Sequence, residues 1–122
     1  MTIKAKILVV ENDPESIEFL RGLLGDSGYQ VVEAANGVQA LGCAKAEKPD
    51  LVLSDILMPG MDGFEMANKI RTDPELSRIP IIFYSAAYHE KHATRLCEAC
   101  GVSDRLEKPA SPEIILKAVD RP

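Results

Sequence analysis

The sequence predicts an α/β fold in which a parallel sheet is covered by helices on both faces. Short apolar runs alternate along the chain with amphipathic stretches of helical period, and several of these runs are apolar almost throughout. Such runs are typical of strands buried on both faces. Regular alternation of strands and helices favours parallel strands joined by helical crossovers. Because 122 residues is a common size for one domain, we expect a single domain over residues 1–122.

Five stretches of the chain predict the strands. The first and third consist mainly of Ile, Leu and Val, as expected of strands buried on both faces, and the fourth has the sequence IIFYS. The predicted strands are Lys6–Val10, 29–34, Leu51–Ser54, Ile81–Ser85 and a short one around 105–106.

Five helices are predicted to follow these strands. Asp or Asn at the N-cap and Pro at the first helical position favour a helix start, and an apolar stripe of helical spacing marks a helix body. These signals occur at Asp13-Pro14, Asn36-Gly37, Asp62 with Glu65, the stripe Ala93, Leu96, Cys97 and Cys100, and Ser111-Pro112. Gly42 weakens the prediction of the second helix, because glycine in a helix interior lowers its stability.

Polar and charged residues follow the predicted strands. Ligands of an open parallel sheet bind beyond the carboxyl ends of its strands, where the strand order reverses. We therefore expect the residues at these ends to converge: Glu11, Asn12 and Asp13 after the first strand, Asp55 after the third, Ser85 at the end of the fourth and Lys108 after the fifth.

This set of groups suits phosphoryl transfer. Carboxylates and a backbone carbonyl are suitable ligands for Mg²⁺, which also keeps several waters. The metal ion neutralises charge on the incoming phosphoryl group, and a carboxylate is able to attack it as a nucleophile. Lysine and hydroxyl groups then bind the oxygens of the product.

Three motifs at these strand ends resemble those of the receiver domains of two-component response regulators, the CheY-like family. Residues 54–63, with the sequence SDILMPGMDG, are similar to the family's phosphorylation-site loop. Ser85-Ala86 and Lys108-Pro109 are similar to its signatures after the fourth and fifth strands. The resemblance covers essentially the whole chain.

The resemblance implies a flavodoxin-like, doubly wound (βα)5 sandwich of three layers with strand order 2-1-3-4-5. It implies that Asp55 is the phosphoacceptor, that Ser85 supplies the hydroxyl contact and that Lys108 is the counter-ion of the phosphoryl group. A Mg²⁺ site would use Glu11, Asn12, Asp55 and the backbone carbonyl of Leu57. The Lys108-Pro109 peptide bond is commonly cis in this family.

The resemblance also implies partners. A sensor histidine kinase or a histidine phosphotransfer domain would donate the phosphoryl group. Phosphorylation would reshape the face of the fourth helix and fifth strand, which would bind a downstream protein or a fused domain. Helical faces near the fourth and fifth helices could support a homodimer. The domain would assist its own phosphorylation and hydrolysis without being a conventional enzyme.

Two residues depart from the family pattern. Asn12 replaces the second acid that usually ends the first strand, so Mg²⁺ should bind more weakly unless Asp13 compensates. Arg105 occupies the position, three residues before Lys108, where many receivers carry a switch Tyr or Phe. An arginine is too polar to fill an apolar space cheaply. It is therefore expected in solvent or paired with an acid at a partner interface.

Three other assignments fit parts of the sequence. The alternative is a pseudo-receiver that binds partners without phosphorylation. Asn12 and Arg105 favour it, but the intact Asp55, Ser85 and Lys108 oppose it. A phosphatase of the haloacid-dehalogenase type is disfavoured, because Leu57 stands where its second acid belongs. Zinc binding by Cys97 and Cys100 with nearby histidines is also disfavoured. His89 and Cys97 would lie roughly 12 Å apart along a helix, too far for one ion.

Composition and charge restrict the partners and the cellular compartment expected for the protein. The net charge of −5 argues against a nucleic-acid surface. No apolar run approaches the roughly 18–20 residues that cross a bilayer, and no signal-peptide pattern precedes the first strand. Three cysteines do not indicate a disulfide framework. We expect a cytoplasmic protein without direct contacts to nucleic acid or membrane.

Overall fold

The computed structural model describes residues 3–86, 101–102 and 104–120, and their core is a parallel five-stranded sheet. The strand order is β2-β1-β3-β4-β5, which confirms the predicted order. The strands are β1 (Lys6–Val10), β2 (Gln30–Ala34), β3 (Leu51–Ser54), β4 (Ile81–Ser85) and β5 (Asp104–Glu107). The order reverses between β1 and β3, so a ligand site is expected at their carboxyl ends.

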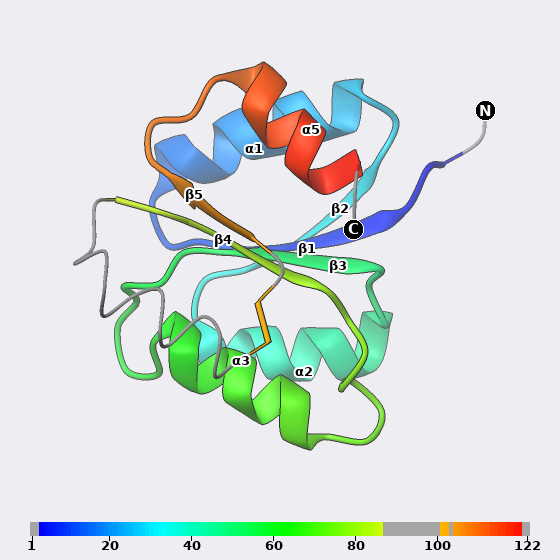
Figure 1. Cartoon of the computed structure of the whole chain (residues 1–122), viewed down its shortest axis with the longest axis vertical. Coiled ribbons are helices and arrows are strands. Elements are labelled where there is room, and N and C mark those ends of the chain that lie inside the picture. Colours follow the sequence, from blue (N-terminus) through cyan, green and yellow to red (C-terminus); the bar gives the residue numbers. More distant parts are fainter. Residues whose placement is uncertain (1–2, 87–100, 103, 121–122) are drawn as a thin grey trace.

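Helices cover both faces of the sheet, which gives three layers (Figure 1). Helices α1 (Pro14–Asp26) and α5 (Pro112–Asp120) lie on one face, and α2 (Gly37–Glu47) and α3 (Gly63–Thr72) lie on the other. Two hydrophobic clusters fill the spaces between the layers. Successive residues of β1 belong to different clusters, since Ile7 and Val9 face α1 and α5 while Leu8 and Val10 face α2 and α3. This confirms the interpretation of the apolar runs as strands buried on both faces.

The predicted start signals cap the helices. A side-chain oxygen that accepts a backbone N–H satisfies one of the donors left unpaired in the first turn. Four side chains do so: Asp13 accepts from Glu15 (3.4 Å), Asn36 from Gln39 (2.9 Å), Asp62 from Glu65 (2.9 Å) and Ser111 from Ile114 (3.2 Å). Short polar residues thus fix where four helices begin.

The structure refines some predicted boundaries. The second strand begins at Gln30 instead of residue 29, and the fifth runs from Asp104 to Glu107. Helix α2 keeps 11 residues although it contains Gly42. Gly42 is exposed, and nothing lies within 4 Å of the position its missing Cβ would take. Its cost is therefore one of helix propensity, about 1 kcal/mol relative to alanine, and the packing of α2 is unaffected.

The predicted fourth helix around Ala93, Leu96, Cys97 and Cys100 lies outside the described residues. The disfavoured zinc site that combines these cysteines with His89 and His92 lies outside them as well. Within the described ranges, no helix has both the length and the apolar character needed to cross a membrane.

Candidate functional site

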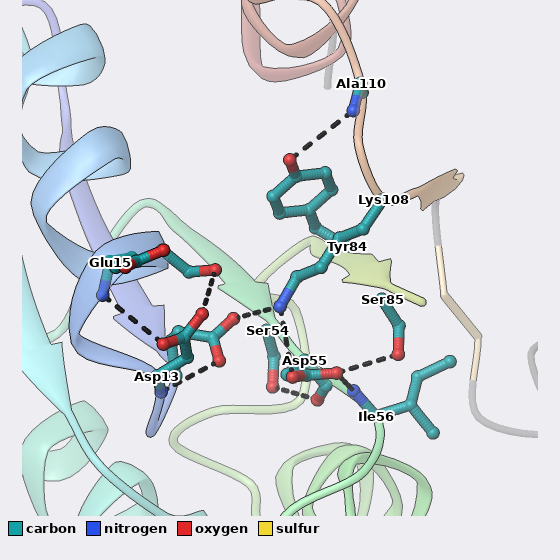
Figure 2. Close-up of polar contacts among 11 residues, drawn as sticks. Asp13, Glu15, Ser54, Asp55, Ile56, Tyr84, Ser85, Lys108 and Ala110 are labelled. Atoms are coloured by element: carbon teal, nitrogen blue, oxygen red, sulfur yellow. Dashed lines mark hydrogen bonds and ion pairs between the residues drawn. The ribbon is translucent and has the colours of Figure 1, made fainter. Parts of the chain in front are cut away.

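Asp55 stands directly after β3, and three groups hold its carboxylate (Figure 2). Its backbone N–H donates to the carbonyl oxygen of Val10 at 2.9 Å, which extends the sheet pairing to this residue. Oδ1 accepts from the Ser85 hydroxyl and from the backbone N–H of Ile56, each at 2.7 Å. Oδ2 accepts from Lys108 Nζ at 3.2 Å. The Asp55 side chain keeps 12% of its surface exposed, so an incoming group still has access to it.

Glu11 is the second carboxylate of the site and is 1% exposed. Its Oε2 accepts from Lys108 Nζ at 2.6 Å, and its Oε1 accepts from the backbone N–H of Asp13 at 3.2 Å. The same ammonium therefore bridges the carboxylates of Glu11 and Asp55. Buried charges are tolerated when they are paired and hydrogen-bonded in this way.

Strand register brings these groups together. Val10 of β1 pairs with Ser54 of β3, and the next residue of each strand is a carboxylate of the site. Lys108 comes from the end of β5, which lies two strands away from β3 in the sheet. The long flexible stem of a lysine spans this distance while its ammonium stays charged. The predicted convergence of Glu11, Asp55, Ser85 and Lys108 is therefore present in the structure.

Glu11, Asp55 and Lys108 together carry a net charge of −1, and this excess negative charge favours the protonated form of each group. Burial raises the pKa of Glu11 above its usual 4.5, and the negative charge of Asp55 adds to this effect, although Lys108 opposes it. Burial by itself would lower the pKa of Lys108, but the hydrogen bond and charge of Glu11 and the charge of Asp55 outweigh it. The pKa of Lys108 therefore lies above its usual value, so the ammonium remains charged at neutral pH.

Gly63, the first residue of α3, allows the loop after Asp55 to fold closely against the helix. A Cβ at this position would lie 2.6 Å from the carbonyl oxygen of Asp55 and 2.9 Å from Cα of Ile56. The Gly63 N–H also donates to the Ile56 carbonyl oxygen at 2.7 Å. Both contacts involve backbone, which yields less easily than a side chain. The sequence predicted a helix start at Asp62, but the need for glycine at the next position comes from packing against the start of the loop at Asp55 and Ile56.

Asp13 serves as the cap of α1. Its Oδ1 accepts from the backbone N–H of Glu15, and its Oδ2 accepts from the Ser16 hydroxyl at 3.1 Å. Both oxygens are thus engaged at the helix start, which opposes a second role for Asp13 as a replacement metal ligand. Asn12 is exposed at the carboxyl end of β1, beside this cap.

The oxygen donors of the site suit a hard cation, but they carry little negative charge. Among the residues that the structure describes, no three His, Cys, Asp or Glu side chains converge where they could hold a metal ion. Glu11 and Asp55 supply two carboxylates, and any further protein ligand would be neutral. Such a set fits Mg²⁺, which accepts oxygen ligands and keeps several waters.

Arg105 is half-buried on β5, where it pairs with Phe83 of β4. The next residue, Leu106, belongs to the cluster beneath α1 and α5, so Arg105 faces the opposite side of the sheet. Arg105 therefore occupies a partly enclosed position on the face of the sheet opposite Leu106.

Tyr84 is a neighbour of the site that the sequence analysis did not single out. The Lys108 ammonium faces its ring, with Nζ 5.4 Å from the ring centroid, and its hydroxyl accepts from the Ala110 N–H at 3.4 Å (Figure 2). A signal was available, because alternation along the fourth strand places Tyr84 on the face opposite Phe83 and one residue before the strand end. A tyrosine at that position is close to the end of the fifth strand.

Comparisons with known proteins identify the family and the fold of the chain. Residues 7–120 match the family described as the response regulator receiver domain. Protein PilH of Pseudomonas aeruginosa is 36% identical over 116 residues, which cover 95% of each chain. The chemotaxis protein CheY4 of Vibrio cholerae has a TM-score of 0.90 at 32% identity, over 96% of this chain and 97% of that one. The receiver domain of the sensor histidine kinase PA1611 from Pseudomonas aeruginosa has a TM-score of 0.87 at 29% identity, over 96% and 95%. That domain was solved with a magnesium ion coordinated in its active-site cleft.

Proposed function

The chain belongs to the response regulator receiver domain family of two-component signalling, and we propose that it acts as a phosphorylation switch with Asp55 as the phosphoacceptor. The donor would be a phosphohistidine of a sensor histidine kinase or of a histidine phosphotransfer domain. The domain would assist its own phosphorylation and hydrolysis without acting on a separate substrate. The output would pass to a downstream protein or a fused domain.

The contacts of the Asp55 carboxylate carry this proposal. A hydroxyl, a backbone N–H and an ammonium all donate to one partly exposed carboxylate at the switch point of the sheet. These groups suit phosphoryl transfer, because donors fixed in advance stabilise the charge that spreads over the phosphoryl oxygens. A carboxylate with a purely structural role would not need three such donors near solvent.

In the proposed reaction, an oxygen of Asp55 attacks the phosphorus of the donor. The new P–O bond forms as the P–N bond to the donor imidazole breaks, and the imidazole takes up a proton as it leaves. The product is a mixed anhydride of Asp55 and phosphate. The Ser85 hydroxyl and the Lys108 ammonium, which donate to Asp55 in the structure, would then donate to phosphoryl oxygens.

A Mg²⁺ ion would be held by Glu11, Asp55, the Asn12 side-chain oxygen and the Leu57 carbonyl, together with waters. When bound, it would offset the repulsion between the carboxylates and the incoming phosphoryl group. Asn12 contributes no charge to this set. The magnesium ion of the related PA1611 receiver domain supports the assignment.

Intact mass spectrometry after incubation with acetyl phosphate tests the proposal. We expect a single phosphoryl adduct that requires Mg²⁺ and that is absent from the Asp55→Asn variant, which keeps the shape of the side chain without its nucleophile. An adduct that persists in Asp55→Asn would contradict the assignment of the acceptor. If neither acetyl phosphate nor a cognate histidine kinase labels the wild-type chain, the pseudo-receiver hypothesis replaces the switch.

A further inference from the structure

Tyr84 of β4 contacts the segment after β5 that carries Lys108. The side chain is 5% exposed and belongs to the hydrophobic cluster beneath α1 and α5. The Lys108 ammonium lies over its ring, and the hydroxyl at the far end of the ring accepts from the Ala110 N–H. One side chain therefore reaches both Lys108 and the residue two positions after it, as Figure 2 shows.

Two consecutive residues of β4 fix the Lys108–Ala110 segment at three points. The carbonyl oxygen of Ser85 accepts the Lys108 N–H at 2.7 Å, and the two Tyr84 contacts hold the Ala110 backbone and the Lys108 ammonium. The Ser85 hydroxyl and the same ammonium both donate to Asp55. Tyr84 and Ser85 of β4 thus support the Lys108–Ala110 segment, and Ser85 also donates to Asp55 itself.

The two carboxylates do not hold Lys108 equally. Nζ lies 2.6 Å from Glu11 and 3.2 Å from Asp55, so the shorter contact is made with the residue that does not receive the phosphoryl group. A lysine stem is flexible, and a buried carboxylate strongly attracts the ammonium at its end. The face of an aromatic ring attracts a cation, and its bulk limits where the stem can move.

We propose that Tyr84 is a positioning residue that holds the Lys108 ammonium within reach of Asp55, and this proposal rests on the function proposed above. The ring supplies a third attraction besides those of Glu11 and Asp55, and the hydroxyl adds a long hydrogen bond to the backbone two residues after Lys108. The competing explanation is that Tyr84 only fills space in the cluster beneath α1 and α5. The two explanations differ in whether Tyr84 and Lys108 depend on one another.

Equilibrium unfolding of the unphosphorylated chain tests this dependence without phosphorylation. The variants are Tyr84→Leu, Lys108→Met and their combination, which form a double-mutant cycle. We expect the combined loss of stability to be smaller than the sum of the two single losses, because each single change removes the same contact. Additive losses would overturn the proposal. Ile82→Ala, a core truncation two residues earlier on the same face of β4, serves as the control and should be additive with Lys108→Met.

Phosphorylation by acetyl phosphate and Mg²⁺, under conditions where every variant is folded, tests the consequence for the site. Loss of a desolvated cation–π contact should slow phosphorylation of Tyr84→Leu by about fivefold to tenfold. Tyr84→Phe keeps the ring and should remain within about twofold of wild type, because the hydroxyl contact is long. Ile82→Ala should match wild type, and Ile82→Val replaces it if the alanine variant unfolds. Equal rates for Tyr84→Leu and Ile82→Ala would assign Tyr84 to the core alone.

The two measurements separate the possible failures. If the wild-type chain accepts no phosphoryl group, the proposed function fails, and the positioning role fails with it even if the unfolding cycle still shows coupling between Tyr84 and Lys108. If phosphorylation occurs but the cycle is additive, only the role of Tyr84 is wrong.

Discussion

Asn12 is the residue at which this site departs most clearly in charge from its family. It stands beside Glu11 and would contribute a neutral oxygen where the family resemblance implies an acid, so the proposed metal site would have two protein carboxylates, Glu11 and Asp55. Because ligand charge is a main determinant of affinity for hard cations, this one residue should control how much Mg²⁺ the switch requires.

Asn12→Asp should therefore strengthen Mg²⁺ binding, by about tenfold, because it adds a negative charge to the ligand set. Isothermal titration calorimetry at fixed ionic strength measures the change. Asn12→Gln is the matched control, since it keeps a neutral amide and should not gain affinity. Equal affinities of Asn12→Asp and wild type would show that residue 12 does not contact the ion.

Gly63 allows a sharp test at the level of single atoms. Gly63→Ala places a Cβ against the backbone of the Asp55 loop and should lower the free energy of unfolding by about 1–3 kcal/mol. Gly42→Ala, in open space on the exposed side of α2, should instead raise it by about 0.5–1 kcal/mol. Urea unfolding of both variants compares the same substitution in the two surroundings. A loss of stability at both positions would contradict the close approach of Gly63.

At the scale of elements, helix-start signals and apolar runs predicted four helix starts and three strands. Three strands coincide with the predicted ranges, and Asp13, Asn36, Asp62 and Ser111 each accept a hydrogen bond at a helix start. These features are local, because a cap or an apolar run depends on residues close in sequence.

The sequence did not predict the features that depend on distant parts of the chain. The need for glycine at position 63 comes from a loop backbone that passes its Cα, and the contact of Tyr84 with Lys108 joins two strands. The convergence of Glu11, Asp55, Ser85 and Lys108 was predictable, since parallel strands end at one edge. The distances between these side chains depend on side-chain packing, which the sequence does not specify, and only the structure provides them.

An ion pair between α1 and β2 makes the stability of the contact between these two elements depend on pH. Arg21 donates to both carboxylate oxygens of Glu33, at 2.5 and 2.9 Å, and this hydrogen bonding lowers the pKa of Glu33 below its usual 4.5. A lowered folded-state pKa stabilises the fold above pH 4.5, and this contribution is lost as the pH falls through the folded value. The pair is largely exposed, so the effect should be small.

Glu33→Gln should remove this pH dependence. The stability difference between wild type and the variant should be constant from neutral pH down to about 5 and should shrink below 4.5 as Glu33 becomes protonated. Urea unfolding at a series of pH values measures the difference. A difference that grows on acidification would give Glu33 a raised pKa and contradict the pairing.

At the scale of the whole molecule, one sheet joins two hydrophobic clusters. Each strand contributes side chains to one or both clusters, so the layers above and below the sheet depend on the same backbone. We therefore expect the domain to unfold in a single cooperative transition. A site formed at the ends of four strands should then be lost in the same transition as the core.

Truncations in the two clusters test this coupling. Leu24→Ala on α1 and Ile70→Ala on α3 should each lower the free energy of unfolding by about 2–5 kcal/mol, since both side chains are fully buried. Circular dichroism and tyrosine fluorescence should report one coincident transition for each variant. The exposed Val38→Ala serves as the control and should change stability by no more than about 0.5 kcal/mol. Two separate transitions would show that the layers unfold independently.

The measurement that tests the central claim most directly is chemical identification of the phosphorylated residue. Borohydride reduces an acyl phosphate of aspartate to homoserine, so reduction of the acetyl-phosphate-treated chain followed by peptide mass spectrometry marks the acceptor. The account predicts homoserine at position 55 only when Mg²⁺ was present, and none in Asp55→Asn. Homoserine at another aspartate, or a phosphoryl adduct that borohydride does not convert, would contradict Asp55 as the phosphoacceptor.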